Sequence, residues 1–448
     1  MALIETGPAR WRPSPRLQRF SWALFDWANQ PYFTLVGAFL FKPYFASTYL
    51  GDPVRGQALI GLVGGSAAAV IAVLSPAFGG ALDRGGHAKR WIVVLSVLFA
   101  AACCGLWFAE PGRTDRLPLV MACMIGAAIL AELMITANNA MMSHLTTAQG
   151  VGRLSGGAVA LGFVGGLAAL FVYLLLFNVM NPPLFGLDKQ TYEPQRAVGA
   201  FCAVWFVLFV TPMLLWTPDR PAGPQVKGAS LRSIVRLLRQ RPVLTRFLLG
   251  RMLLGDGLSA AGVFAGVLAT GLFDWGTAEL ATYAVLLMTM SGLAAWCAGQ
   301  ADDRWGPKAI VMLCVTGLCI AVAGVGLVSA DRLAFVFPIT PPTPGDGFLA
   351  TTGERIFMSL ALLIGLSAGP LYGSLRSWLV RLSPADETGR WFGLFSFSSK
   401  ATAFAAPLII GGLTAWLGDL RVTIPVVLAF LVAGLICLRR VPEGVRVA

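Results

Sequence analysis

Long uninterrupted apolar runs constrain this chain more than any other feature. Runs of about twenty residues recur throughout its 448 residues, of which only 12% are charged, about half the charged fraction of an ordinary soluble domain. A helix of about twenty residues spans the hydrocarbon core of a bilayer, whereas a membrane β-barrel needs alternating segments of about ten residues. Backbone polar groups in lipid must be satisfied within the spanning structure itself. We therefore predict an all-α integral membrane protein.

The apolar runs define twelve predicted transmembrane helices. Their approximate limits are 20–48, 57–82, 91–109, 118–142, 154–179, 197–216, 244–272, 279–301, 309–329, 356–381, 391–416 and 423–439. Loops and adjoining span ends carry 22 lysines and arginines on the side of the N-terminus and 8 on the opposite side. Because positively charged loops stay in the cytoplasm, this bias predicts that both termini are cytoplasmic. We expect the protein to lie in the cell membrane, which is the inner membrane if the source is bacterial.

An eight-residue pattern occurs twice, once after the second span of each half. The first copy contains Gly79, Asp83, Arg84 and Gly86, and the second contains Gly299, Asp303, Arg304 and Gly306. Two weaker repeats keep the same order. Asp26 corresponds to Asp256, and the pair Gly152-Arg153 corresponds to Gly389-Arg390. Such self-similarity at a nearly fixed offset indicates two pseudo-symmetric six-helix bundles.

The repeat divides the chain into five parts. They are an N-terminal tail (1–19), a first bundle (20–216), a linker (217–243), a second bundle (244–440) and a C-terminal tail (441–448). The linker places Arg232, Arg236 and Arg239 at helical spacing, which predicts a basic amphipathic helix on the anionic inner leaflet. The stretch 330–354, rich in proline and glycine, is expected to be an extracytoplasmic loop.

The duplicated Gly-x-x-x-Asp-Arg-x-Gly pattern resembles the signature loop of the major facilitator superfamily. In that superfamily the small residues allow close helix approach, and the Asp-Arg pair bonds to neighbouring helix ends and closes one face. The resemblance implies a secondary transporter that works by alternating access, with the halves rocking about a central site.

The first span contains Trp22-Ala-Leu-Phe-Asp26-Trp-Ala-Asn29. This segment resembles the Trp-Ala-aromatic-Asp-Trp-Ala-Asn signature of the vacuole effluxer-like, or unknown-major-facilitator, family. Asp256-Gly257, and Phe392-Gly393 followed by Lys400, are similar to its seventh and eleventh helices. Fungal members are implicated in the export of amino acids from the vacuole, so the resemblance implies an exporter of amino acids.

A more distant similarity links the chain to the sugar–cation symporters of the glycoside-pentoside-hexuronide family. The shared features are the first-span Asp26 and the eleventh-span Lys400. In that family the first-helix Asp binds sugar, and acids on the second helix hold the cation. Here the second span, 57–82, contains no acidic residue. This departure weakens the case for a sodium site and favours a proton as the coupling ion, with sodium kept as an alternative.

Charged side chains within predicted spans are the candidates for substrate binding and coupling, because charges in lipid are costly and usually face the bundle interior. The charged candidates are Asp26, Glu132, Arg251, Asp256, Arg376 and Lys400, and the polar ones are Asn29, Thr136 and Asn139. Glu132, Thr136 and Asn139 share one helix face. Arg251 and Asp256 are five residues apart, so we expect no direct pair. Arg376 either faces the cavity or extends to the membrane surface.

We expect Glu132 and Asp26 to pair with Lys400 in one conformation and to accept a proton in another. Burial favours a neutral carboxyl group and a nearby cation favours the charged form, so movement of Lys400 would change protonation. A static set of ion pairs that fixes helix register is the alternative interpretation.

The sequence contains no P-loop, catalytic triad pattern or metal-ligand spacing, so we expect neither an enzyme nor a bound cofactor or metal. The scattered basic residues favour a topological role over nucleic-acid binding. The expected partners are the lipid bilayer and a small polar or zwitterionic solute, and the expected state is a monomer. Two alternatives remain on the same fold: a lipid or lysolipid flippase, and a non-transporting assembly or sensor protein.

Overall fold

The computed structural model describes residues 13–220, 231–329, 331–334, 336–341, 347–403, 405–417 and 420–444. Parts of the predicted tails (1–12 and 445–448) and of the linker (221–230) lie outside the described residues. The helices are α1 (Pro15–Pro31), α2 (Phe41–Tyr44), α3 (Pro53–Gly85), α4 (Ala88–Gly105), α5 (Leu117–Met141), α6 (Val151–Tyr173), α7 (Glu193–Trp216), α8 (Leu231–Gln240), α9 (Pro242–Phe273), α10 (Thr277–Trp305), α11 (Pro307–Gly326), α12 (Thr352–Leu382), α13 (Thr388–Lys400), α14 (Ala405–Leu417) and α15 (Thr423–Arg439).

Nine helices within the described ranges are long and apolar enough to cross a membrane. They cover nine of the twelve predicted spans, with ends that differ by a few residues. The last predicted span, 423–439, coincides with α15, a shorter apolar helix. The two remaining spans, 20–48 and 391–416, are interrupted helices.

The first span changes its helical geometry after Pro31. Wider, π-type turns cover Tyr32–Phe39 and Phe45–Tyr49 and flank the short helix α2. Proline has no N–H and crowds the preceding turn, so a regular hydrogen-bond ladder cannot pass through it unchanged. The predicted single helix over 20–48 is therefore wrong in detail, although the segment remains helical throughout most of its length.

The eleventh predicted span is two helices, α13 and α14, joined by the turn 401–403. A continuous helix would require Pro407 to donate a backbone hydrogen bond that proline lacks. The chain turns before this residue instead, and the break exposes the hydroxyl group of Thr402 to a neighbouring helix. The sequence-based expectation of one helix over 391–416 is corrected accordingly.

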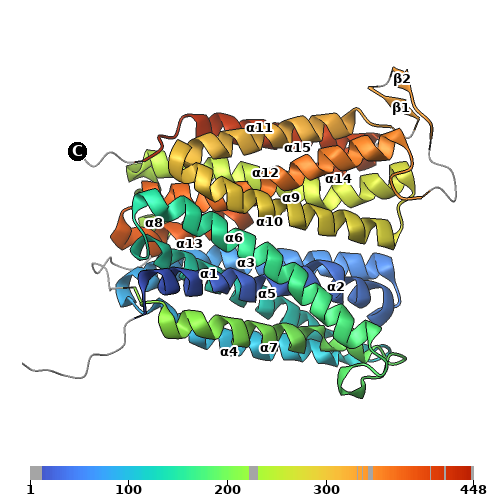
Figure 1. Cartoon of the computed structure of the whole chain (residues 1–448), viewed down its shortest axis with the longest axis horizontal. Helices are drawn as coiled ribbons and strands as arrows, with labels where there is room; N and C mark the ends of the chain where they lie inside the picture. Colours follow the sequence, from blue (N-terminus) through green and yellow to red (C-terminus); the bar gives the residue numbers. More distant parts are fainter. Residues whose placement is uncertain are drawn as a thin grey trace, which may run out of the picture.

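The helices lie side by side in two groups (Figure 1). Helices α1 and α3–α7 pack on one another and form the first group. Helices α9–α12 pack with α15 in the second group, to which α13 and α14 also belong through their contacts with α9. The groups meet along two seams, α3 with α13 and α6 with α10. We call the end of the molecule that carries Asp83 and Asp303 the loop face. The two seams place the repeated sequence patterns of the two halves against each other.

The opposite end carries a small hairpin of β1 (Arg332–Leu333) and β2 (Phe337–Pro338), visible at one corner of Figure 1. It lies inside the stretch that the sequence predicted to be a loop. The next helix, α12, begins with a capping box, in which Thr351 and Glu354 satisfy each other's backbone N–H groups.

The described part of the linker forms α8, as its spacing predicted. Leu237 is buried, whereas Arg232, Arg236 and Arg239 are exposed. This arrangement gives α8 one apolar side and one basic side.

Candidate functional site

The first seam closes where α3 meets the start of α13. The Asp83 carboxylate accepts hydrogen bonds from the backbone N–H groups of Gly389 (2.8 Å) and Arg390 (2.7 Å). Free N–H groups at a helix start attract a carboxylate. A Cβ atom added to Gly79 would lie 2.3 Å from the Gly389 carbonyl oxygen, so only glycine permits this approach. Asp83 and Gly79 therefore join the two helix groups.

The second seam repeats this geometry between α10 and the start of α6. Asp303 accepts from the backbone N–H groups of Gly152 (2.8 Å) and Arg153 (3.2 Å). A Cβ atom on Gly299 would lie 2.8 Å from the Gly152 carbonyl oxygen. The signature pattern and the repeated Gly-Arg pair are thus the two partners in one kind of interaction, which occurs twice. Each Asp of the signature pattern binds the Gly-Arg pair that opens a helix of the other half.

The arginine and the last glycine of each signature pattern differ from the aspartate in exposure and in backbone conformation. Arg84 and Arg304 have exposed side chains. Gly86 ends α3 with a φ of 60°, and Gly306 separates α10 from α11 with a φ of 84°. These positive φ values favour glycine. The aspartates of the pattern make the expected bonds to helix starts of the other half.

Arg220, which sequence reasoning did not select, is buried in the first seam. Its guanidinium lies 2.5 Å from Asp83 Oδ1 and donates to the carbonyl oxygens of Ala385 and Asp386. Its Nε donates to His144 (3.3 Å). Its position just after the sixth span was the only sequence signal, and loop arginines are too common for that signal to be specific.

Asp302 was also missed, because the repeat aligns Asp303 with Asp83. The Asp302 side chain is almost fully buried and pairs with Arg381 at 2.8 Å. It also accepts a hydrogen bond from Ser377 at 2.5 Å. Arg381 is shared with Asp303 at 3.3 Å. The second seam therefore contains two neighbouring carboxylates where the first contains one.

Arg376 occupies the centre of a polar cluster that joins four helices. Its guanidinium pairs with Asp26 at 3.0 Å and donates to Asn139 at 3.2 Å. It also donates to the hydroxyl group (3.1 Å) and the carbonyl oxygen (2.8 Å) of Ser155. Of the two alternatives for Arg376, the structure has the inward one. The partner of Asp26 is Arg376, so the expected pairing of Asp26 with Lys400 does not occur in this conformation.

A second cluster lies between α5 and α13. Lys400 Nζ is 2.6 Å from Glu132 Oε1, and the two side chains are 28% and 16% exposed. One turn away, the hydroxyl groups of Thr136 and Ser396 are 2.8 Å apart. Because Asn139 on the same α5 face contacts Arg376, α5 contributes to both clusters. The face shared by Glu132, Thr136 and Asn139 is the one the sequence predicted to be polar.

Arg251 and Asp256 on α9 do not pair with each other, in agreement with their spacing. Arg251 donates to Ser398 (3.1 Å), and its guanidinium carbon lies 3.4 Å from the centroid of the Phe395 ring. Asp256 accepts a 2.6 Å hydrogen bond from Thr402. Among the described residues, Arg251 Nε and Asp256 Oδ1 are buried without a hydrogen-bond partner. A buried donor and a buried acceptor thus remain available on one helix.

Asn29 is buried on α1, and its side-chain oxygen likewise has no partner among the described residues. It does not join the contacts of either charged cluster that are described above. The described residues contain no group of three or more potential metal ligands.

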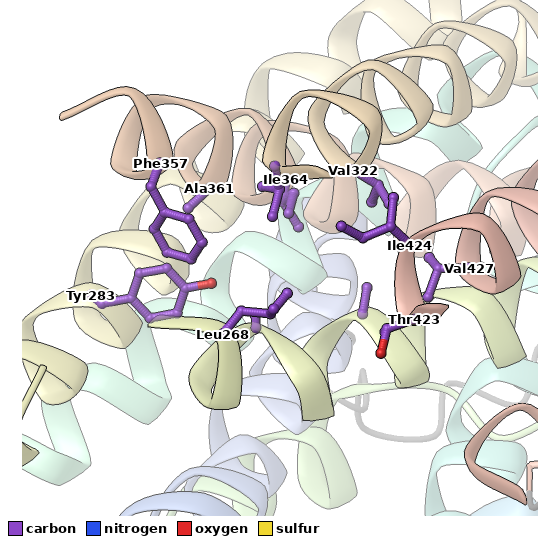
Figure 2. A pocket seen from close by; sticks show the side chains of 12 residues that line it. Leu268, Tyr283, Val322, Phe357, Ala361, Ile364, Thr423, Ile424 and Val427 are labelled. Atoms are coloured by element: carbon purple, nitrogen blue, oxygen red, sulfur yellow. The ribbon is translucent and has the colours of Figure 1, made fainter. Parts of the chain in front are cut away.

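Two cavities differ sharply in size and position. The smaller one lies within the second helix group and is lined by apolar side chains such as Tyr283, Phe357 and Ile364 (Figure 2). Its volume of about 30 Å³ is close to the space one water molecule occupies, so it is too small for an organic solute. The larger one, about 740 Å³, is a mainly apolar groove between α1, α6 and α10.

A sequence profile described as "Vacuole effluxer Atg22 like" matches residues 135–444. Autophagy-related protein 22 of Cryptococcus neoformans is 25% identical over 300 residues, which cover 64% of this chain and 52% of the relative. Autophagy-related protein 22-1 of Neosartorya fischeri is 24% identical, with 60% and 44% covered. The chain therefore spans about half the length of these fungal relatives. An uncharacterized MFS-type transporter of Bacillus subtilis, YxiO, is 21% identical, and the match covers 95% of both chains.

Solved structures share the fold along the whole chain. The human organic anion transporter MFSD10 superposes with a TM-score of 0.70 at 14% identity, covering 95% of this chain and 100% of that one. The major facilitator transporter FucP in its outward conformation gives a TM-score of 0.69 at 13% identity, with 96% and 99% covered. These neighbours confirm the predicted all-helical major facilitator architecture. The chain therefore belongs to the Atg22-like vacuole effluxer family, and it has the fold of the major facilitator transporters.

Proposed function

We propose that this transporter moves a small polar or zwitterionic solute by alternating access, with proton coupling at Glu132. The ion pair between Glu132 on α5 and Lys400 on α13 supports this proposal most directly. Each partner comes from a different helix group. The pair can therefore form only while the two groups are close together at this level of the membrane.

Movement of α13 away from α5 would separate Glu132 from Lys400. A carboxylate left without a counter-ion in a poorly solvated site is costly, and protonation removes that cost. The Asp26–Arg376 pair joins α1 and α12, again across the two groups. Both pairs would break and reform as the halves rock, which links proton binding to the conformational change.

The family resemblance carries our proposal of amino acids as the substrate class. The buried charged residues of the helix groups, among them Arg251 and Asp256 on α9, agree with a charged or zwitterionic solute. Since Arg251 and Asp256 are five positions apart and point to different faces of α9, one small solute would not bind both of them. The family description as an effluxer favours export.

The charge asymmetry of the loops supports a topology in which the loop face and both termini are cytoplasmic. In this orientation the two seams close the cytoplasmic side, and the substrate site would open to the opposite side. We propose that one chain is sufficient for transport, because both helix groups belong to the same chain.

The test is transport by purified protein in liposomes with an imposed pH gradient and a mixture of radiolabelled amino acids. Glu132→Gln should abolish accumulation driven by the gradient while exchange of labelled for unlabelled solute persists. Glu110→Gln is the matched control, because Glu110 pairs with Arg116 outside the spans. Unchanged gradient dependence in both Glu132→Gln and Asp26→Asn would refute proton coupling at these residues.

A lipid or lysolipid flippase is the second candidate, and the groove between α1, α6 and α10 is the observation that favours it. A flippase needs an apolar path that opens sideways to the bilayer, and this groove is mainly apolar. The charged clusters are a separate feature and favour a soluble solute. Reduction of a fluorescent lysolipid by external dithionite distinguishes the two: complete bleaching that requires the protein would support lipid transport.

A further inference from the structure

The groove between α1, α6 and α10 combines an apolar wall with basic side chains at one end. Arg19 and Arg153 line the end at the loop face, and residues such as Val164, Leu167 and Leu293 line the rest. We propose that this groove is a binding site for one anionic phospholipid from the leaflet on the loop face. The lipid would be a resident ligand that stabilises one conformation.

The dimensions of the groove fit part of a lipid chain. Its α6 side extends from Arg153 to Leu167, a helical length of roughly 21 Å at about 1.5 Å per residue. One leaflet contributes about half of the roughly 30 Å hydrocarbon core. The groove therefore reaches from the headgroup region toward the bilayer midplane. Its volume of about 740 Å³ falls in the usual range for ligand pockets.

The charge at the loop-face end favours an anionic headgroup. Arg19 and Arg153 line the groove, and Arg381 in the second seam contacts Asp302 and also Asp303, the carboxylate with which Arg153 pairs. Three guanidinium groups thus accompany two carboxylates, which leaves a net positive charge. The Arg153 side chain is 68% exposed although it pairs with Asp303, so donors of its planar guanidinium remain accessible to a phosphate.

The groove crosses the boundary between the helix groups, because α6 belongs to one and α10 to the other. Its walls depend on the packing of Gly156 against Gly299 in the second seam. Separation of α6 from α10 would divide the groove. A lipid that binds the intact groove must therefore favour the conformation in which the loop face is closed.

Two variants address the two parts of the proposed site. Gly157 lines the groove, and a Cβ atom there would meet no atom within 4 Å. Gly157→Leu therefore places its Cβ atom in open space and adds a side chain to the groove. Gly64→Leu is its control, because Gly64 on α3 also has open space and lies outside the groove. Arg19→Gln removes headgroup charge, and Arg90→Gln removes an exposed arginine from the start of α4.

The experiment measures thermal unfolding and bound lipid, by native mass spectrometry, for protein titrated with phosphatidylglycerol or phosphatidylcholine. Phosphatidylglycerol should raise the melting temperature of the unmodified protein and bind at one saturable site, whereas phosphatidylcholine should do neither. Gly157→Leu should abolish the response. Arg19→Gln should weaken binding about five-fold, the effect expected of one arginine near an anionic headgroup. Both control variants should respond like the unmodified protein.

Three outcomes would overturn the proposal. Equal responses of Gly157→Leu and Gly64→Leu would show that lipids bind only around the perimeter. Equal responses to the two lipids would show that the headgroup is not recognised. Protein-dependent translocation of labelled phosphatidylglycerol would make the groove a transport path rather than a resident site. If Gly157→Leu fails to fold, the comparison of Arg19→Gln with Arg90→Gln still decides, and none of these results depends on the role of Glu132.

Discussion

Replacement of Asp83 by asparagine removes the charge that holds the first seam together. The buried guanidinium of Arg220 loses its counter-ion, although it keeps the carbonyl oxygens of Ala385 and Asp386. The start of α13 also loses an anionic cap. Asp303→Asn is the matched change in the second seam, where the exposed Arg153 and the shared Arg381 are the charged partners.

The expected costs of the two substitutions differ. Asparagine keeps an acceptor oxygen for the helix start but loses the negative charge there, which costs up to about 1 kcal/mol. Loss of one partner of a buried ion pair costs about 3–5 kcal/mol. Arg220 keeps other acceptors, so we take the lower value, and Asp83→Asn then costs about 4 kcal/mol in total. Asp303→Asn costs about 2 kcal/mol, because an exposed pair contributes at most about 1 kcal/mol and Asp302 still holds Arg381. The difference of about 2 kcal/mol corresponds to roughly a thirty-fold change in population.

Hydrogen–deuterium exchange of the purified protein measures this difference. Peptides that cover the starts of α6 and α13 contain the amide groups bound by Asp303 and Asp83. Opening of the loop face should expose these amides, so exchange should increase more in Asp83→Asn than in Asp303→Asn. Asp115→Asn removes an exposed pair with Arg113 and should change exchange little. Equal increases in the two seam variants, or a larger increase in Asp303→Asn, would refute the reasoning.

Further substitutions test packing and hydrogen bonding through the melting temperature. Gly156→Leu should destabilise the protein by about 1–3 kcal/mol, because its Cβ would lie 2.5 Å from the Ala295 carbonyl oxygen; an unchanged melting temperature would contradict the close seam. Thr402→Val should cost about 1–3 kcal/mol by removing the hydrogen bond to Asp256, and Thr402→Ser should restore it. Trp275→Phe removes a 2.8 Å hydrogen bond to a buried glutamate and should cost about 1.5–3 kcal/mol; no loss would show that water replaces the indole.

Much of the fold was predictable because each apolar run is a local property. Lipid excludes unsatisfied backbone groups, so a run of sufficient length must be helical whatever its neighbours are. The exceptions are near prolines. Proline lacks the N–H group that would pair with a carbonyl oxygen of the preceding turn. The turn before Pro407 and the wider turns after Pro31 depend on how that carbonyl oxygen finds another partner, and the available partners depend on neighbouring helices. Asp256, for example, accepts a hydrogen bond from the turn residue Thr402.

The charged residues of the site were predictable as a set, since charges are rare in apolar spans and stand out in the sequence. Their pairing was only partly predictable. Glu132 pairs with Lys400 as expected, but Asp26 pairs with Arg376. Sequence separation carries no information about which of several cations on other helices comes within 3 Å of a given carboxylate. That distance is set by the packing of α1, α5, α12 and α13.

The sequence by itself determined that the chain crosses a membrane, that it has two related halves, and that Asp83 and Asp303 occupy equivalent positions. These conclusions follow from hydrophobicity and repetition, which are independent of long-range contacts. Tertiary structure alone decided that the two repeats bind each other crosswise, Asp83 to Gly389 and Asp303 to Gly152. It also brought Arg220 into the seam. A hydrogen bond between residues some 300 positions apart (Asp83 and Gly389 are 306 apart) exists only after the helices have packed.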